Sequence, residues 1–202
     1  MAPTSATMTE CRAIGIVTNS NATPLHNTLR GLCSAYTSFK LYEAVLKVAG
    51  KATSIKMQRR IPPKQATPSP FADISPDRWM MVWESDAMRG PAFKDLPASV
   101  REVCEAQCFC ANAPEFWKDL GAVLDYDMLK DGNEYICSHN GYEFLVQIMR
   151  FAPLEQPGNP DSAPKNFKGN YVMEVKTRVP EGKHFEGARA LGSFGQILVP
   201  CT

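Results

Sequence analysis

The alternation of apolar and polar residues predicts a chain made mainly of β-strands. The clearest strand-like segments are 11–17, 41–48, 53–60, 78–84, 142–151 and 171–179. Successive side chains of a strand point to opposite faces, so each segment presents one face to apolar surroundings. Helices are predicted at 24–33, 112–121 and 181–198, from helical spacing and end signals such as Thr23-Pro24. The segment 100–110 fits a helix and a strand equally by its period.

Two turn signals divide the segment that follows the second predicted helix. Asp131-Gly132 and Asn140-Gly141 each stand between strand-like runs. Both dipeptides accept the positive φ angles of a tight reversal, which makes them strong short-range hairpin signals. The sequence therefore predicts that the chain turns back at both places and forms a three-stranded meander.

The last run of this meander is apolar on both of its faces. One face carries Tyr142, Phe144, Val146 and Ile148, and the other carries Glu143, Leu145, Gln147, Met149 and Phe151. An antiparallel sheet with one face in water is polar on that face. We therefore expect one face of this strand to line a core and the other to meet a helix or a partner.

The strand count, about nine, favours a closed sheet. Antiparallel strands joined in sequence tend to close into a barrel, because closure removes exposed edges. We expect an α+β fold, mainly β: an antiparallel multistranded closed barrel flanked by two or three helices. Residues 1–10 are expected to be a disordered N-terminus, and 11–202 a single barrel domain with proline-rich loops at 61–77 and 152–170.

Composition narrows the range of functions. The 202 residues carry a net charge of +1, so no strong electrostatic attraction to nucleic acid or an anionic membrane is expected. No apolar run approaches the length of a membrane-spanning helix, and no signal peptide opens the chain. Trp79, Trp83 and Tyr142 have the period-two spacing typical of core aromatics rather than of a base-stacking platform.

The seven cysteines form no scaffold-like pattern, and their odd number favours reduced thiols. Cys104, Cys108 and Cys110 lack both the two-residue spacing of a zinc knuckle and further ligands nearby. The histidines have no Ser or Cys partner at a recognisable spacing, and no glycine-rich phosphate loop is present. We expect no metal, no cofactor and no catalytic residues.

An ordered series of segments carries a family resemblance. Residues 116–121 read Phe-Trp-Lys-Asp-Leu-Gly and lead into Leu124-Asp125-Tyr126 and Lys130-Asp131-Gly132. Residues 26–33 read His-Asn-Thr-Leu-Arg-Gly-Leu-Cys, and the segments 41–60, 79–83 and 171–179 follow in the same order. The series resembles subunit 18 of the Mediator complex over nearly the whole chain, apart from the first ten residues and the two loops.

The resemblance implies a non-catalytic subunit of the Mediator head module in the nucleus, supporting regulated transcription by RNA polymerase II. It implies pairing with the barrel of subunit 20, binding of a C-terminal helix of subunit 8, and contacts with other head subunits and RNA polymerase II. Apolar sheet surface beyond the needs of a monomer marks interfaces. The candidate partner-binding residues are Trp79, Met81, Leu145, Met149 and Phe151.

The alternative is a tunnel-shaped barrel that hydrolyses triphosphates. Such enzymes place two carboxylates and a cation on one strand face as Glu-x-Glu-x-Lys, to hold a metal and phosphates. The nearest match is Val172-Met173-Glu174-Val175-Lys176, in which the first carboxylate is missing. A single Glu and Lys on a strand are typical of a charge pair. Asp125 and Asp127 are expected on a polar outward face.

Overall fold

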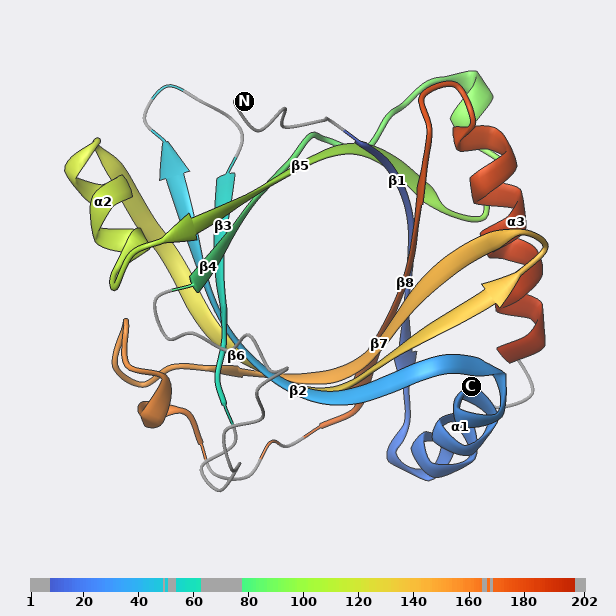
Figure 1. Ribbon diagram of the computed structural model, residues 1–202, viewed down its shortest axis with the longest axis horizontal. Helices are drawn as coiled ribbons and strands as arrows, with labels where there is room; N and C mark the ends of the chain where they lie inside the picture. The colour runs from blue at the N-terminus through green and yellow to red at the C-terminus, as the bar shows by residue number, and fades with distance from the viewer. Residues whose placement is uncertain are drawn as a thin grey trace.

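The computed structural model describes residues 8–48, 50, 54–62, 78–164, 167 and 169–198, and these form eight strands and three α-helices (Figure 1). In chain order the elements are β1 (Met8–Val17), α1 (Asn19–Leu32), β2 (Cys33–Val48), β3 (Ser54–Arg60), β4 (Arg78–Glu84), β5 (Ser99–Phe109), α2 (Ala113–Asp119), β6 (Ala122–His139), β7 (Tyr142–Pro153), β8 (Tyr171–Val179) and α3 (His184–Leu198). Short 3-10 turns lie at Pro91–Phe93 and Pro160–Ser162.

The strands form a closed antiparallel barrel in the order β1-β5-β4-β3-β2-β6-β7-β8. The first strand closes it, because β1 pairs with β5 on one side and with β8 on the other. The expected fold class is confirmed. The ambiguous segment 100–110 belongs to β5, whose partners are β1 and β4. Seen along its axis, the barrel is a ring with the helices outside it (Figure 1).

The strand count of about nine was too high by one, because the predicted reversal at Asp131-Gly132 is wrong. These residues lie in the middle of β6, paired with β2 on one side and β7 on the other. A Cβ placed on Gly132 would lie 2.1 Å from the carbonyl oxygen of Ile148 and 2.7 Å from the Cα of Met149. Here the missing side chain permits a close approach of two strands, not a turn.

The reversal predicted at Asn140-Gly141 is confirmed. Both residues have positive φ angles, 51° and 78°. The turn joins β6 to β7 and sets His139 opposite Tyr142. Two successive positive φ angles are the geometry of the two-residue hairpin turn that Asn-Gly favours.

The ends of several elements differ from those predicted. Helix α1 begins at Asn19, with Thr18 at the N-cap position but no capping hydrogen bond from its side chain, so that Pro24 lies inside the helix rather than at its first position. Helix α3 begins at His184, after the expected start at 181. Strand β1 begins at Met8 instead of residue 11, because residues 8–10 already pair with neighbouring strands. Part of the N-terminus expected to be disordered is therefore β1, and residues 1–7 lie outside the described residues.

Two apolar clusters lie between the outer face of the barrel and the helices. Helices α1 and α3 cover the side formed by β1, β7 and β8, and α2 covers the side formed by β2, β3, β4 and β6 (Figure 1). The face of β7 that carries Phe144, Val146 and Ile148 is fully buried under α1 and α3. The Phe144 ring stacks on Phe194 of α3 with centroids 4.7 Å apart. The opposite face of β7 therefore points into the barrel.

The close approach at Gly132 yields a prediction for stability. Gly132→Ala should destabilise the fold by about 2–4 kcal/mol, because the new methyl group overlaps backbone that cannot move without breaking strand pairing. The free energy of unfolding is measured by urea titration. As a matched control, Gly31→Ala in α1 adds a methyl group with nothing within 4 Å and should stabilise slightly. Equal effects of the two substitutions would contradict the assignment of Gly132 as a packing position.

Candidate functional site

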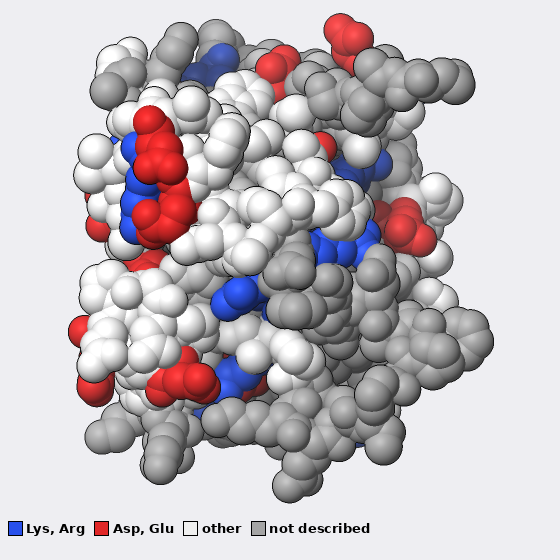
Figure 2. Space-filling view, turned by 60° about the vertical axis from the view of Figure 1, so that its left-hand side comes forward, with Lys and Arg blue, Asp and Glu red and all other residues white. Residues whose placement is uncertain are grey.

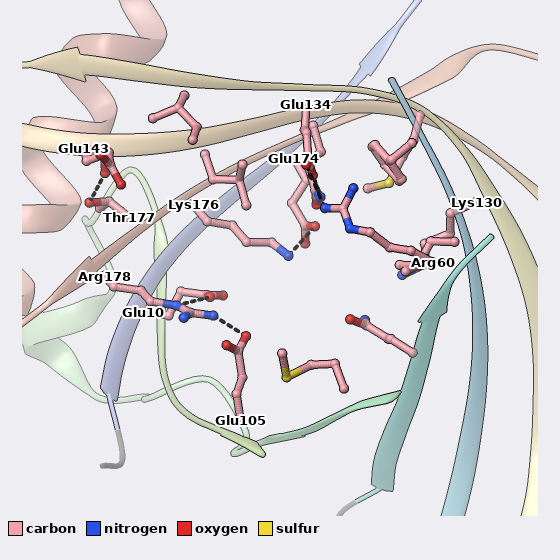
Figure 3. Close-up of a pocket in the computed structure, with 18 of the residues that line it drawn as sticks. Glu10, Arg60, Glu105, Lys130, Glu134, Glu143, Glu174, Lys176, Thr177 and Arg178 are labelled. Atoms are coloured by element: carbon pink, nitrogen blue, oxygen red, sulfur yellow. Dashed lines mark hydrogen bonds and ion pairs between the residues drawn. The ribbon is translucent and has the colours of Figure 1, made fainter. Parts of the chain in front are cut away.

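The barrel interior contains a cavity of about 650 Å³. Every second residue of the surrounding strands points into it, and many of these side chains are charged (Figure 3). Carboxylates come from β1, β5, β6, β7 and β8, and cations from β3, β4, β6 and β8. Most of the charged residues that the close-up labels are joined to a partner of opposite charge.

Four largely buried charges form a group that we call the Arg12 cluster: Arg12, Glu10, Glu84 and Glu174. The Arg12 side chain is only 7% exposed. Its Nη2 atom lies 2.5 Å from Oε1 of Glu10 and 2.7 Å from Oε1 of Glu84, and its Nε lies 3.4 Å from Oε1 of Glu174. One guanidinium therefore joins carboxylates from β1, β4 and β8.

Further cations surround the cluster. Lys56 Nζ lies 2.9 Å from Oε2 of Glu84, and Arg101 Nη1 lies 3.2 Å from the same oxygen. Burial opposes ionisation of Glu84, yet the hydrogen bond from Arg12 and the charge of Lys56 outweigh it and lower the pKa of Glu84 to about 2. Burial likewise opposes ionisation of Glu174, but Lys176 and Arg12 lower its pKa. Both carboxylates are therefore held in the charged form.

Three more interior carboxylates also contact a cation, whereas Glu143 of β7 lies at an exposed position. Arg178 contacts Glu105 and lies 3.7 Å from Glu10, and Arg60 lies 2.7 Å from Glu134. Glu43 of β2 is a further paired carboxylate. Its Oε2 accepts hydrogen bonds from Lys130 Nζ at 2.7 Å and from Gln58 Nε2 at 2.6 Å. Lys130 and Glu134 project into the cavity from β6, and Glu174 and Arg178 project into it from β8 (Figure 3).

The inner faces of β2, β6 and β7 contribute most of the apolar side chains of the cavity. Five of them form what we call the apolar wall: Phe39, Leu41, Ile136, Leu145 and Met149. Phe39 and Met149 are buried, and the other three are half-buried. Polar residues interrupt this wall, because Glu134 and Gln147 lie opposite each other between the Ile136–Leu145 pair and Met149.

The structure separates the residues predicted to bind a partner. Leu145 and Met149 line the cavity. Trp79, 2% exposed, is also among the residues that line the cavity. It and Met81 belong to the apolar cluster under α2, where the Trp79 ring packs edge-on against Tyr42. Phe151, 37% exposed, has Lys130 Nζ 5.6 Å from its ring centroid. The five residues form no continuous surface, and their contact with a partner stays a prediction.

Other apolar side chains are far more exposed. Phe109, Phe116, Leu120 and Val123, in and next to α2, are each more than half exposed. Figure 2 looks onto the α2 side, where opposite charges sit together in separate groups with broad uncharged surface between them. These residues are not among those predicted from the sequence to bind a partner. The sequence did contain a signal for them. Phe116 and Leu120 stand on either side of Lys118-Asp119 as apolar residues, whereas the exposed face of a helix should be polar.

The segment 172–176, the nearest match to a triphosphatase strand, contains an ion pair. Glu174 pairs with Lys176 at 2.8 Å, the predicted charge pair. Lys56 points inward to Glu84, whereas the Arg59 guanidinium lies outside, 4.8 Å from the centre of the Trp79 ring.

Asp127 is not on a polar outward face. It is 8% exposed, and its Oδ2 accepts hydrogen bonds from the Tyr42 hydroxyl at 3.1 Å and the Gly158 backbone at 2.6 Å. It therefore anchors the segment after β7 to the barrel. Asp125 is bound at the surface by Lys47, 2.7 Å away.

The described residues contain neither a candidate metal site nor a membrane-spanning helix. No group of three or more His, Cys, Asp and Glu side chains there has the arrangement of a metal site. None of the helices there has the length and apolar character to cross a membrane. The six cysteines in the same part of the chain are free thiols.

Comparison with known proteins identifies relatives by fold alone. No family model and no curated protein matches the chain. Among solved structures, the chain is similar to a chain of the Schizosaccharomyces pombe Mediator head module, with a TM-score of 0.73 and 17% identity over 96% of both chains. It is also similar to a Pyrococcus horikoshii protein, with a TM-score of 0.57 and 12% identity over 95% of this chain and 89% of that one.

A third similar structure is a Hippeastrum protein, described as a putative adenylyl cyclase with a dominant triphosphatase activity. Its TM-score is 0.55 with 9% identity, over 96% of this chain and 87% of that one. At these identities the likeness establishes a shared barrel fold and nothing about activity.

The Arg12 cluster yields a prediction for stability. Arg12→Met should destabilise the protein by about 3–5 kcal/mol at pH 7, because it leaves three buried carboxylates without their shared cation. Urea unfolding measures the change. The control is Lys183→Met, which removes an exposed pair with Glu186 at 2.9 Å and should have little effect. A similar change in the free energy of unfolding for both variants would show that the Arg12 cluster contributes no more to stability than an exposed ion pair.

A second prediction concerns acid. The pKa of Glu84 is lowered from 4.5 to about 2 by folding, so its ionisation stabilises the native state above pH 4.5. That contribution, on the order of 3 kcal/mol, is lost as the pH falls from about 4.5 to about 2. Glu84→Gln should flatten the loss of stability in this window, measured by urea unfolding at several pH values. Glu155→Gln, at an exposed position, is the control and should leave the dependence of stability on pH unchanged. If Glu155→Gln flattens this dependence as much as Glu84→Gln does, the effect does not come from Glu84.

Proposed function

We propose that this chain is a non-catalytic barrel subunit of a Mediator head module, of the subunit 18 type. The observation that carries the proposal is the likeness to a head-module chain over 96% of both chains. The ordered segments that resemble the subunit 18 family support the same assignment, and they include residues of α1, α2 and five strands.

The state of the interior charges supports a structural role. Metal-dependent hydrolysis of a triphosphate needs carboxylates that bind the metal and cations that bind the phosphates. Here Glu174 contacts both Lys176 and Arg12, and Glu84 contacts Arg12, Lys56 and Arg101. To bind a metal ion and a triphosphate, these carboxylates and cations would first have to break their ion pairs with one another. Paired interior charges therefore favour a barrel whose interior holds its strands together.

The expected partners follow from the proposed assignment. They are the barrel of subunit 20, a C-terminal helix of subunit 8, other head-module subunits and RNA polymerase II, in the nucleus. The exposed apolar residues Phe109, Phe116 and Leu120 support the presence of a partner, because apolar groups gathered on one surface commonly mark an interface. Mediator function would then come from the outer surface of the barrel and not from its interior.

Co-purification tests the proposal. The chain is expressed alone and together with subunit 20 and the subunit 8 tail from the same organism, and the products are compared by size exclusion. We expect a stoichiometric complex with improved solubility. Leu120→Asp, on the exposed apolar surface, should lower the yield of complex without changing the circular dichroism of the chain. Lys94→Ala, at an exposed position away from α2, is the control.

One outcome would replace the proposal with the enzymatic alternative. That outcome is a stable monomer that binds neither partner and releases phosphate from triphosphates with manganese. Loss of this release in Glu174→Gln would then assign the activity to the barrel interior. A complex with no phosphate release favours the scaffold.

A further inference from the structure

We propose that the barrel interior is a binding site for one small, uncharged molecule with an apolar body. The cavity of about 650 Å³ lies within the range of roughly 300–1,000 Å³ typical of small-molecule sites. Eight-stranded barrels are wide enough inside to hold one such ligand. The proposal concerns the inner face of the barrel, so it is independent of which subunits bind the outer face.

The apolar wall provides the surface for the body of the ligand. Ile136 of β6 lies directly opposite Leu145 of β7, so their side chains form one apolar pair facing the cavity. Phe39 and Met149 both lie opposite Gly132, one on each side of it. Gly132 contributes no side chain to the wall at this point, and the β7 backbone packs closely against it.

Accessibility distinguishes this wall from a sealed core. Leu41, Ile136 and Leu145 keep partial exposure to the cavity, whereas Phe144, Val146 and Ile148 on the other face of β7 are fully buried. Partly exposed apolar surface inside a concave site gains free energy when an apolar group covers it.

The charge pairs decide the charge of the ligand. The carboxylates of Glu10, Glu105, Glu134 and Glu174 each contact an arginine or lysine. An anionic ligand would have to lose its hydration and pair with a cation that is already engaged, which is unfavourable. An uncharged molecule meets no such penalty, and its polar atoms can share hydrogen bonds with the paired side chains. The geometry thus points to a neutral ligand rather than a phosphate.

Two fluorescent dyes with one skeleton test this directly. N-phenyl-1-naphthylamine is uncharged, and 1-anilinonaphthalene-8-sulfonate is the same molecule with a sulfonate added. We expect the neutral dye to bind the folded chain with one-to-one stoichiometry. The sulfonate should bind at least about tenfold more weakly, because its charge finds no free partner in the cavity. Inorganic triphosphate should not displace the neutral dye.

Variants locate the bound dye. Leu145→Trp and Ile136→Trp each fill the cavity from one member of the apolar pair, and each should weaken binding of the neutral dye by about tenfold. Two variants guard against one of them failing to fold, which circular dichroism and the thermal midpoint report. Leu120→Gln is the matched control: it removes an apolar side chain that is 62% exposed outside the barrel, and it should leave dye binding unchanged.

Three results would overturn the proposal. They are the absence of saturable dye binding, binding of the sulfonate as tight as that of the neutral dye, and loss of binding in Leu120→Gln but not in folded Leu145→Trp or Ile136→Trp. The last would place the dye on the outer apolar surface. Displacement by triphosphate would instead assign the interior to an anionic ligand.

Discussion

The rest of the structure depends on the closure of the barrel by β1. This strand pairs with β5 and β8, and its inward side chain Arg12 contacts carboxylates from three strands. A shift of β1 by one residue would turn Arg12 into the outer apolar cluster and Cys11 into the charged interior. Each error would leave buried charges unpaired, so the ion cluster fixes the register of the strand that closes the sheet.

Local features of the chain were predictable from the sequence, and contacts between distant segments were not. The turn at Asn140-Gly141 depends on backbone angles that the two residues themselves prefer. Asp131-Gly132 has the same local signal, but its glycine is needed because β7 passes so close to β6 there. Only the paired sheet distinguishes the two. The barrel could be predicted because its evidence, alternating segments joined in sequence, is also local.

The interior site illustrates the same limit. The sequence revealed that β7 is apolar on both faces, but not that Leu145 and Met149 face the cavity while Phe144 faces α3. The sequence did not predict that Glu10, Arg12 and Glu84 are buried together, because a charged residue in a strand usually faces solvent. They lie far apart in the sequence and meet only when the ring is closed. No signal within a single segment identifies such a cluster.

The fold likenesses include a Mediator head-module chain and a protein described as having triphosphatase activity, so the barrel fold by itself does not specify an activity. Any activity of such a barrel depends on the side chains that it presents. Carboxylates and cations left free inside a barrel make a site for metal and phosphate; the same groups bound to one another act as cross-links between strands. In this chain Val172 occupies the place of one carboxylate, and Glu174 is held by Lys176 and Arg12. Pairing of the charges leaves the apolar wall as the part of the interior whose side chains take no part in the ion pairs.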